Sequence, residues 1–145
     1  TDDWIRVGHL RALCQTLEIQ DRVEFVLNQP FSILKEWLAK SSVGLHTMWN
    51  EHFGIGIVEM MSAGLVTIAH DSGGPKSDIV TTGKTGYLAA TESEYERVML
   101  RALVEGVDSE RNREIREAGR IAARKFSVDE FHTAFKSSWL ESTLC

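Results

Sequence analysis

Short apolar segments alternate with longer amphipathic segments along most of this chain. The short segments predict buried strands, at residues 23–27, 43–46, 65–69 and 87–89. Apolar residues at helical spacing predict helices at residues 4–19, 32–40, 55–63, 95–103, 115–122 and 131–135. Parallel strands need a crossover between them, which is usually a helix. The alternation therefore predicts an α/β fold, with a Rossmann-like, mainly parallel sheet and helices on both of its faces.

Composition and charge exclude several classes of protein. The chain has 145 residues, 43% hydrophobic and 26% charged, which is enough to bury the core of a globular domain. Its net charge of -5 has the wrong sign for coating nucleic acid. No apolar run approaches the ~18 residues of a membrane span. The two cysteines, Cys14 and Cys145, form neither a metal-ligand spacing nor a disulfide framework, so we expect no metal site.

The number of predicted strands indicates part of a larger protein. Doubly wound nucleotide-binding domains commonly have about five or six strands. This chain opens with a helix and shows only the strands given above. We therefore interpret residues 1–145 as a single domain that is truncated at its N-terminal side.

Several residues mark the ends of the predicted helices. Gly64 is placed to end the helix over 55–63, because glycine accepts the left-handed conformation common at helix ends. Capping-box patterns precede two later helices: Thr91 with Glu94, and Ser127 with Glu130. We expect the apolar stripes that follow them, over 95–103 and 131–135, to lie in the core.

The segment from residue 46 to residue 59, HTMWNEHFGIGIVE, is the richest candidate for a site. Ligands of open parallel sheets bind beyond the carboxyl ends of the strands, and this segment follows a predicted strand. Gly54 and Gly56 let a ligand approach the backbone at the start of the next helix. The N–H groups and dipole of a helix start favour phosphate there.

Two carboxylates, Glu51 and Glu59, bracket this helix start eight residues apart. Glu59 lies about five residues into the helix, or roughly 7–8 Å along its axis. A nucleotide sugar fits this spacing, with its diphosphate at the helix start, its sugar near Glu51 and its ribose hydroxyls at Glu59. The alternative is that both are solvated surface residues. Apolar neighbours favour the functional reading for Glu59, because a carboxylate on a sandwiched helix needs a partner.

The second candidate segment follows the strand at 65–69. Ser72 to Pro75 must form a turn, and Gly73 and Gly74 either serve only that turn or let a ligand approach. Lys76 contacts either a phosphate or water. Histidines stand at or near strand ends, where they are more often hydrogen-bonded scaffold than acid or base: His46, His52 and His70.

The residues from 44 to 80, GLHTMWNEHFGIGIVEMMSAGLVTIAHDSGGPKSDIV, resemble the retaining GT-B glycosyltransferases of family four. The signature of that family is a Glu, seven residues and a second Glu, which Glu51 and Glu59 match. The stretches WNEHFGIGIVE and HDSGGPKSDIV are most similar to one branch, the α-1,2-mannosyltransferases that extend a dolichol-linked oligosaccharide with GDP-mannose. This resemblance covers about a quarter of the chain, and it implies the C-terminal, donor-binding half of a GT-B fold.

The resemblance also implies roles for single residues. Glu51 would contact the donor sugar and act in catalysis, and Glu59 would hold the ribose. The other donor-binding residues would be Phe53, Gly54, Ile55, Asn28, Gly73, Gly74 and Lys76. Family members use neither a metal nor another cofactor, because helix N–H groups and basic side chains neutralise the leaving diphosphate.

The acceptor, a lipid-linked oligosaccharide, would bind a half of the enzyme outside these residues. The full-length protein would work at the cytosolic face of the endoplasmic reticulum membrane, and the fragment alone would be soluble and have little or no activity. Three alternatives stay open: a GT-B transferase for another nucleotide sugar, a nucleotide-sugar epimerase, or a non-catalytic partner module with a Rossmann-like scaffold.

Overall fold

The computed structural model describes residues 2–104, 106 and 108–143, with side-chain surroundings for 3–104, 106 and 108–139. Two compact units make up the chain, Thr1–Leu34 and Lys35–Cys145, and their boundary falls inside helix α2 (Phe31–Lys40). The prediction of one domain over 1–145 stays a prediction.

The first unit contains helix α1 (Asp2–Thr16) and the short helical turn η1 (Gln20–Arg22). The helix predicted at residues 4–19 is thus confirmed, and it ends earlier than predicted, at Thr16. The predicted strand at 23–27 is wrong, although Val23 has extended backbone angles. A strand needs a neighbour to pair with, and the described residues of this unit contain no second one. None of residues 3–34 is buried.

The second unit is built on a parallel sheet in the order β1–β2–β3, formed by β1 (Val43–His46), β2 (Val66–His70) and β3 (Tyr87–Ala89). The first and last of these match the predicted ranges, and β2 begins and ends one residue later than predicted. The parallel α/β class is confirmed, with three strands in the described residues where four were expected.

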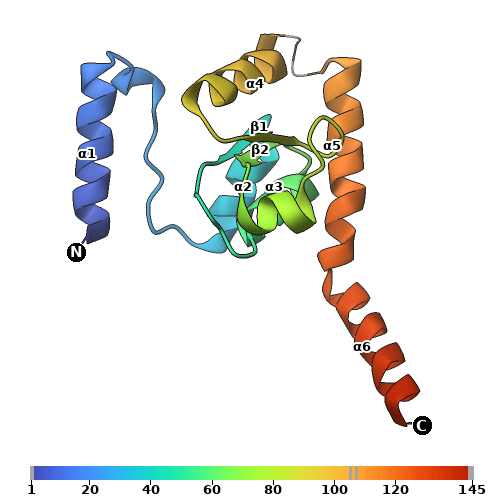
Figure 1. Cartoon of the computed structure of the whole chain (residues 1–145). Coiled ribbons are helices and arrows are strands. Elements are labelled where there is room, and N and C mark those ends of the chain that lie inside the picture. The colour runs from blue at the N-terminus through green and yellow to red at the C-terminus, as the bar shows by residue number, and fades with distance from the viewer. Residues whose placement is uncertain (1, 105, 107, 144–145) are drawn as a thin grey trace. The chain divides into compact units, whose positions relative to one another are not determined.

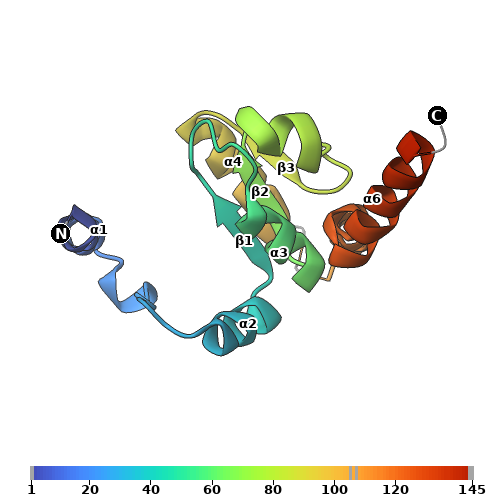
Figure 2. The same ribbon diagram turned by 90° about the horizontal axis from the view of Figure 1, so that it is seen from below.

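Helices α3 (Ile55–Ala63) and α4 (Glu92–Val104) cover opposite faces of the sheet (Figures 1 and 2). Successive side chains of β2 point to alternate faces. Ala69 joins a buried cluster with residues of α3, whereas Val66 and Ile68 join a cluster that includes Ala102 of α4. The core is therefore apolar on both sides of a nearly continuous hydrophobic strand, as expected for a buried parallel sheet.

Helix α5 (Glu110–Ala123) lies at the amino edge of the sheet (Figure 1). Its arginines donate to carbonyl groups of the segments that enter the strands: Arg111 to Gly83, Arg116 to Ser42, and Arg120 to Ala63. The remaining elements are the helical turns η2 (Pro75–Ile79) and η3 (Arg124–Phe126) and helix α6 (Val128–Thr143). Because α5 occupies the amino edge, the loops of the carboxyl edge are left for a ligand.

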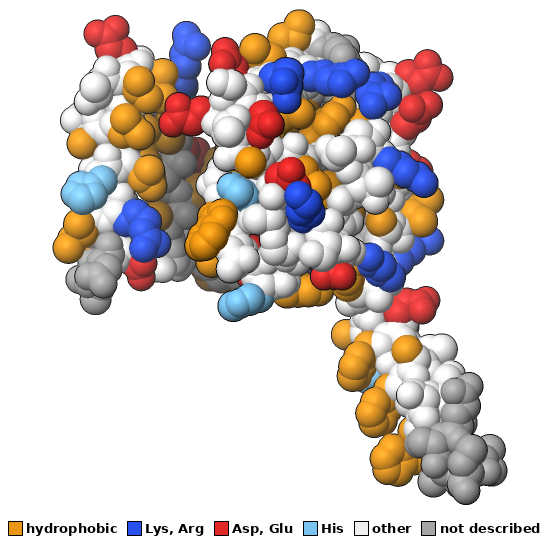
Figure 3. Space-filling model, in the orientation of Figure 1, with side chains coloured by type: hydrophobic (Ala, Val, Ile, Leu, Met, Phe, Trp, Pro, Cys, Tyr) orange, Lys and Arg blue, Asp and Glu red, His pale blue; other side chains and the backbone are white. Residues whose placement is uncertain are grey.

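The apolar stripes of α4 and α6, which were both predicted to lie in the core, differ in how far they are buried. On α4, Tyr95, Val98 and Met99 are partly buried against the core. On α6, the expectation is wrong: Phe131 is 65% and Phe135 58% exposed, and hydrophobic side chains line one side of this helix (Figure 3). In the described part of the chain, no helix combines the length and apolarity needed to cross a bilayer.

Candidate functional site

Two strands of the sheet end next to the predicted site residues. The carboxyl ends of β1 and β2 are His46 and His70, as the sequence predicted. The loop 47–54 follows β1, and the turn 71–74 follows β2. The prediction that Ser72 to Pro75 form only a turn is wrong, because Gly73 and Gly74 already begin the short helix that continues through η2. Parallel strands bring these two segments to one edge, where backbone and side-chain hydrogen bonds join them.

Glu51 lies beside the start of α3, where the sequence placed it. A Cβ built on Gly54, the residue that caps this helix, would lie 3.5 Å from Cγ of Glu51. One carboxylate oxygen of Glu51 is 3.8 Å from Nε2 of His46, and both side chains are half-buried, at 24% and 22% exposure. The hydroxyl of Tyr95 lies 3.4 Å from the carbonyl oxygen of His46. Glu51 is therefore partly shielded from water yet reachable from the loop side.

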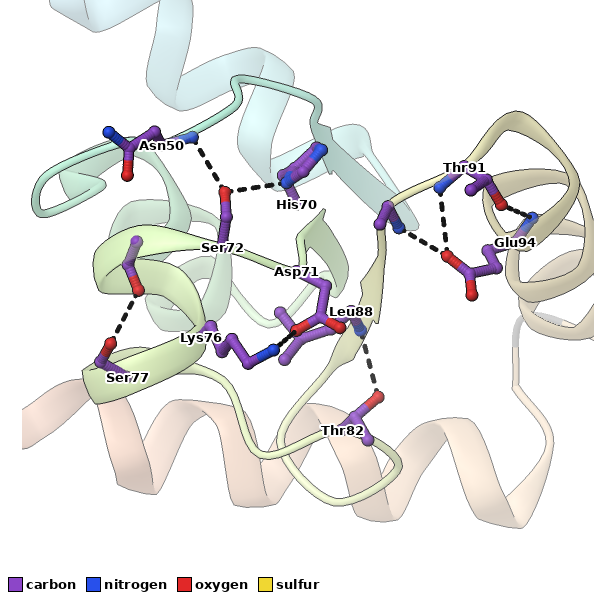
Figure 4. A network of polar contacts seen from close by, with 12 residues as sticks. Asn50, His70, Asp71, Ser72, Lys76, Ser77, Thr82, Leu88, Thr91 and Glu94 are labelled. Atoms are coloured by element: carbon purple, nitrogen blue, oxygen red, sulfur yellow. Dashed lines mark hydrogen bonds and ion pairs between the residues drawn. The ribbon is translucent and has the colours of Figure 1, made fainter.

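The loop that carries Glu51 is attached to the turn after β2 (Figure 4). The backbone N–H of Asn50 donates to Oγ of Ser72 at 2.8 Å, and the N–H of Gly74 donates to the carbonyl of Glu51 at 2.9 Å. Oγ of Ser72 is also 2.9 Å from Nδ1 of His70. Glu51 is thus held through the residue before it and through its own carbonyl.

Gly73 and Gly74 make this attachment sterically possible. Gly73 has a φ of 54°, which favours glycine, and a Cβ there would collide with the carbonyl oxygen of Glu51. A Cβ on Gly74 would collide with the carbonyl oxygen of His52. Both glycines therefore serve the packing of two loops, and a direct contact between either glycine and a ligand stays a prediction.

The start of α3 is exposed in part: Ile55 is 59% exposed, whereas Gly54 is buried. Gly54 caps the helix with a φ of 95° and brings no capping side chain. The N–H of Ile57 donates to the carbonyl of Gly54 at 2.9 Å, whereas the N–H groups of Ile55 and Gly56 have no partner inside the helix. A Cβ on Gly56 would meet no heavy atom within 4 Å. An anion can therefore approach the amides and the positive dipole end here.

Glu59 lies one turn along α3 from Ile55, on the same helical face. Ile55 is 59% exposed and Glu59 half-buried, while Ile57, Val58 and Met61 form the buried face. Helix α3 packs against both the sheet and α5, and Glu59 keeps part of its surface exposed, so the expectation that burial forces Glu59 to find a partner stays a prediction. The position still suits a ligand that lies along the open face from the helix start.

The remaining predicted residues have varied surroundings. Phe53 is 42% exposed and packs edge-to-face on Phe126, with ring centroids 5.2 Å apart. Lys76, on η2, pairs with Asp71 at 3.0 Å, so it must exchange this partner to contact a phosphate (Figure 4). Asn28 belongs to the first unit, where it lines a cavity of about 270 Å³. The other predicted residues belong to the second unit, and the donor-binding role of Asn28 stays a prediction.

Two ionisable groups near this edge have shifted pKa values. Hydrogen bonds from the backbone N–H groups of Ala90 and Thr91 lower the pKa of Glu94, which caps α4 (Figure 4). Thr91 Oγ1 accepts from the N–H of Glu94 in return, so this predicted capping box is confirmed. Burial raises the pKa of Tyr95. Across the described residues, no cluster of three His, Cys, Asp or Glu is placed to hold a metal.

Solved structures show which fold this chain has. The Anabaena protein HepE in complex with UDP superposes with a TM-score of 0.81 and 22% identity, over 93% of this chain and 36% of that one. The C-terminal domain of a glycosyl transferase group 1 family protein, LpcC of Francisella tularensis, has a TM-score of 0.69 and 18% identity, over 88% of this chain and 65% of that one. The chain thus has the α/β fold of a GT-B glycosyltransferase domain.

Residues 6–122 match the family described as "Glycosyl transferases group 1", and the chain belongs to that family. It is 46% identical over 140 residues to the human GDP-Man:Man(3)GlcNAc(2)-PP-Dol alpha-1,2-mannosyltransferase. That alignment covers 94% of this chain and 28% of the human protein, so the chain spans little more than a quarter of its relative. The family resemblance seen in residues 44–80 is confirmed.

Sequence reasoning missed the attachment of the Glu51 loop by Ser72. The only signal was a hydroxyl residue directly after a strand and before two glycines, in His70–Asp71–Ser72–Gly73–Gly74. That pattern predicts a turn, and nothing in it shows which distant N–H the hydroxyl will accept from. The proximity of His46 to Glu51 was likewise not predicted.

Proposed function

We propose that this chain is the donor-binding domain of a glycosyltransferase that transfers mannose from GDP-mannose to a dolichol-linked oligosaccharide with retention. The observation that carries the proposal is the place of Glu51 beside the partly exposed start of α3. The name of the human relative, 46% identical over most of this chain, supports the choice of donor and acceptor.

Each site residue has a proposed role that its surroundings allow. Glu51 contacts the hydroxyls of the donor sugar, and Glu59 accepts hydrogen bonds from the ribose, since both carboxylates border the open face of α3. The backbone amides of Phe53, Gly54 and Ile55 hold sugar and phosphate. Asn28 lies near the base.

The charge that develops on the leaving GDP is stabilised by the dipole and amides of the α3 start. Gly73 and Gly74 keep the turn after β2 close to this place, and Lys76 adds a positive charge when it leaves Asp71. In this proposal, the protein uses no metal and no other cofactor. Basic residues outside this chain complete the neutralisation.

The acceptor is assigned to the rest of the enzyme, because the chain covers only 28% of the human relative. The full-length enzyme would act at the cytosolic face of the endoplasmic reticulum membrane, where a dolichol-linked acceptor is embedded. We further propose that residues 1–145 alone bind the donor weakly and transfer little or no sugar. Calorimetric titration of this fragment with GDP-mannose tests the first statement, and a transfer assay with the fragment tests the second.

The experiment that tests the proposal is mannose transfer by the full-length enzyme with Glu51→Ala. We expect a loss of at least about 100-fold in kcat, since the carboxylate borders the reacting sugar. Glu114→Ala, which removes an exposed glutamate of α5, is the matched control and keeps full activity. Unchanged transfer by Glu51→Ala would contradict the proposal and favour a non-catalytic partner module.

Donor choice needs a separate comparison. HepE, which shares the fold, was solved with UDP, so transfer from UDP-sugars is the competing activity. Full-length enzyme that transfers from a UDP-sugar faster than from GDP-mannose would overturn the donor assignment. Interconversion of a free UDP-sugar without an acceptor would instead show an epimerase.

A further inference from the structure

We infer that Ser72 and His70 form a positioning pair that sets the place of Glu51 at the start of α3. This inference rests on the proposed role of Glu51. Its basis is a chain of contacts from the central strand to the loop: Nδ1 of His70 lies 2.9 Å from Oγ of Ser72, and that oxygen accepts from the N–H of Asn50 at 2.8 Å (Figure 4).

The direction of the protons between His70 and Ser72 depends on the tautomer of His70, and we take the tautomer with its proton on Nε2. The N–H of Asn50 can only donate, so Ser72 Oγ accepts there and has its own proton to give. Nδ1 of a neutral His70 with its proton on Nε2 is an acceptor at 2.9 Å. The hydroxyl is then used on both sides, and its rotation is fixed by two partners. A serine without the histidine would lose this constraint.

The pair is anchored at the end of the central strand of the sheet. His70 ends β2, which pairs with β1 on one side and β3 on the other, and His70 itself is in register with Ala89. The N–H of Ser72 donates to the carbonyl of His70 at 2.8 Å, which fixes the turn that carries the hydroxyl. The position of Ser72 Oγ is therefore set by the core.

The pair acts on Glu51 through the backbone on either side of it. Asn50, the residue before Glu51, has a φ of 53°, a left-handed conformation that it keeps while its N–H is bound to Ser72. The carbonyl of Glu51 accepts from the N–H of Gly74 in the same turn. Without the Ser72 contact, only the second attachment remains, and the carboxylate can shift relative to α3.

A purely structural role of Ser72 would predict that its removal lowers stability and activity together. Asn50 is exposed, so water can replace Ser72 as the acceptor of its N–H, and little stability should be lost. A misplacement of about 1 Å can nevertheless cost up to ~100-fold in rate. A positioning role thus predicts a loss in kcat without a matching loss of thermal stability or donor affinity.

The first experiment is steady-state mannose transfer from GDP-mannose by the full-length enzyme carrying Ser72→Ala. We expect kcat to fall by about 10- to 100-fold, while KM for GDP-mannose stays within about twofold, because the helix start and Glu59 are unchanged. Ser77→Ala is the matched control. Its hydroxyl, on η2, donates to the carbonyl of Gly73 and not to the Glu51 loop, so we expect unchanged kcat.

A second pair of variants tests the geometry at His70. In His70→Asn, the side-chain amide reaches the place of Nδ1 and its oxygen can accept from Ser72; in His70→Gln, the amide reaches the place of Nε2. We expect His70→Asn to keep kcat within about threefold and His70→Gln to lose about tenfold. This comparison also decides the matter if Ser72→Ala fails to fold.

Equal kcat in Ser72→Ala and Ser77→Ala, or in the two His70 variants, would overturn the inference. Glu51→Ala, measured in the same assay, separates this result from a failure of the proposed function. If Glu51→Ala is inactive while Ser72→Ala is normal, only the positioning role is lost. If Glu51→Ala is fully active, the proposed role of Glu51 fails first.

Discussion

The two edges of the sheet in the second unit are built from opposite kinds of residue. At the amino edge, long arginines of α5 donate to the carbonyls of Gly83, Ser42 and Ala63. Side chains thus satisfy the backbone acceptors of the segments that enter the strands. At the carboxyl edge, glycines and one serine let two loops pack backbone against backbone. One edge is closed by side chains, and the other is left open beside a helix start.

This difference separates stability from function. The amino edge uses cationic side chains that pair with backbone carbonyls. The carboxyl edge keeps N–H groups and a positive helix end available to an anion, and there the closeness of the loops sets the position of Glu51. Changes at the first edge should therefore alter unfolding, and changes at the second should alter transfer.

The largest effect is expected from Gly73→Ala. An added Cβ would collide with the carbonyl of Glu51 and push its loop away. We expect transfer by the full-length enzyme to fall about 100-fold, or about 2.7 kcal/mol in activation free energy. Steady-state kinetics with GDP-mannose checks this.

Gly83→Ala is the control for backbone strain. Gly83 also has a positive φ, of 74°, but it lies at the amino edge, and a Cβ there would make only an ordinary 3.5 Å contact with Arg111. It should lose about 1 kcal/mol of stability and keep its kcat. A loss of transfer equal to that of Gly73→Ala would contradict the separation of the two edges.

The next largest effect is expected from Asn112→Ala, which should lower the stability of the protein. This residue is 1% exposed, and its side-chain N–H₂ donates to the carbonyls of Ala102 and Gly106, which joins the end of α4 to the start of α5. We expect the free energy of unfolding to fall by about 2 kcal/mol, as measured by urea denaturation. KM for the donor should not change.

The neighbouring variant Arg113→Ala, at an exposed position of α5, should change stability by no more than about 0.5 kcal/mol. A large rise in donor KM with Asn112→Ala would show that the amino edge also shapes the site. That result would contradict the separation of stability and function between the two edges.

Gly56→Ala should move stability and function in opposite directions. Alanine is favoured over glycine in a helix by about 0.5–1 kcal/mol, and the added Cβ meets no protein atom within 4 Å. We therefore expect a small gain in unfolding free energy. The same methyl group occupies the space proposed for the donor, so KM for GDP-mannose should rise. A gain in stability with unchanged KM would place the donor elsewhere.

The smallest expected effect depends on pH. Backbone N–H groups of Ala90 and Thr91 hold the pKa of Glu94 below its model-compound value of 4.5. A pKa that is lower in the folded state contributes stability above the unfolded pKa, and this is lost as pH falls through the folded value. Wild type should thus be slightly more stable than Glu94→Gln at neutral pH, and the difference should shrink below about pH 4.5.

Thermal denaturation at a series of pH values measures this stability difference between wild type and Glu94→Gln. Glu96→Gln, an exposed charge change on the same helix, is the control. A difference between wild type and Glu94→Gln that stays constant down to acidic pH would show that Glu94 stabilises α4 by its shape and not by its charge.

Local signals allowed much of the second unit to be predicted. The strands at 43–46 and 87–89 and helix α3 with its glycine end match the structure, because hydrophobic periodicity and cap residues act within a few positions of each other. The place of Glu51 at the helix start was predictable for the same reason, since it lies only three positions before Gly54. The predicted roles of the site residues remain to be tested.

Predictions failed where a segment depends on a distant neighbour. The segment 23–27 has a strand pattern but no strand beside it in its unit, and the aromatic stripe of α6 has the spacing of a core helix but is exposed. The same limit hid the contact between Ser72 and Asn50, which are 22 residues apart.

The amino-acid sequence by itself determined the alternation of strands and helices, the helix caps and the spacing of Glu51 and Glu59, because these follow from neighbouring residues and from backbone preferences. Only the tertiary structure decided which loops meet, which apolar faces are covered, and that the turn after β2 holds the Glu51 loop. Such contacts depend on how the chain brings distant backbone groups together, and a hydroxyl or an N–H carries no mark of its partner.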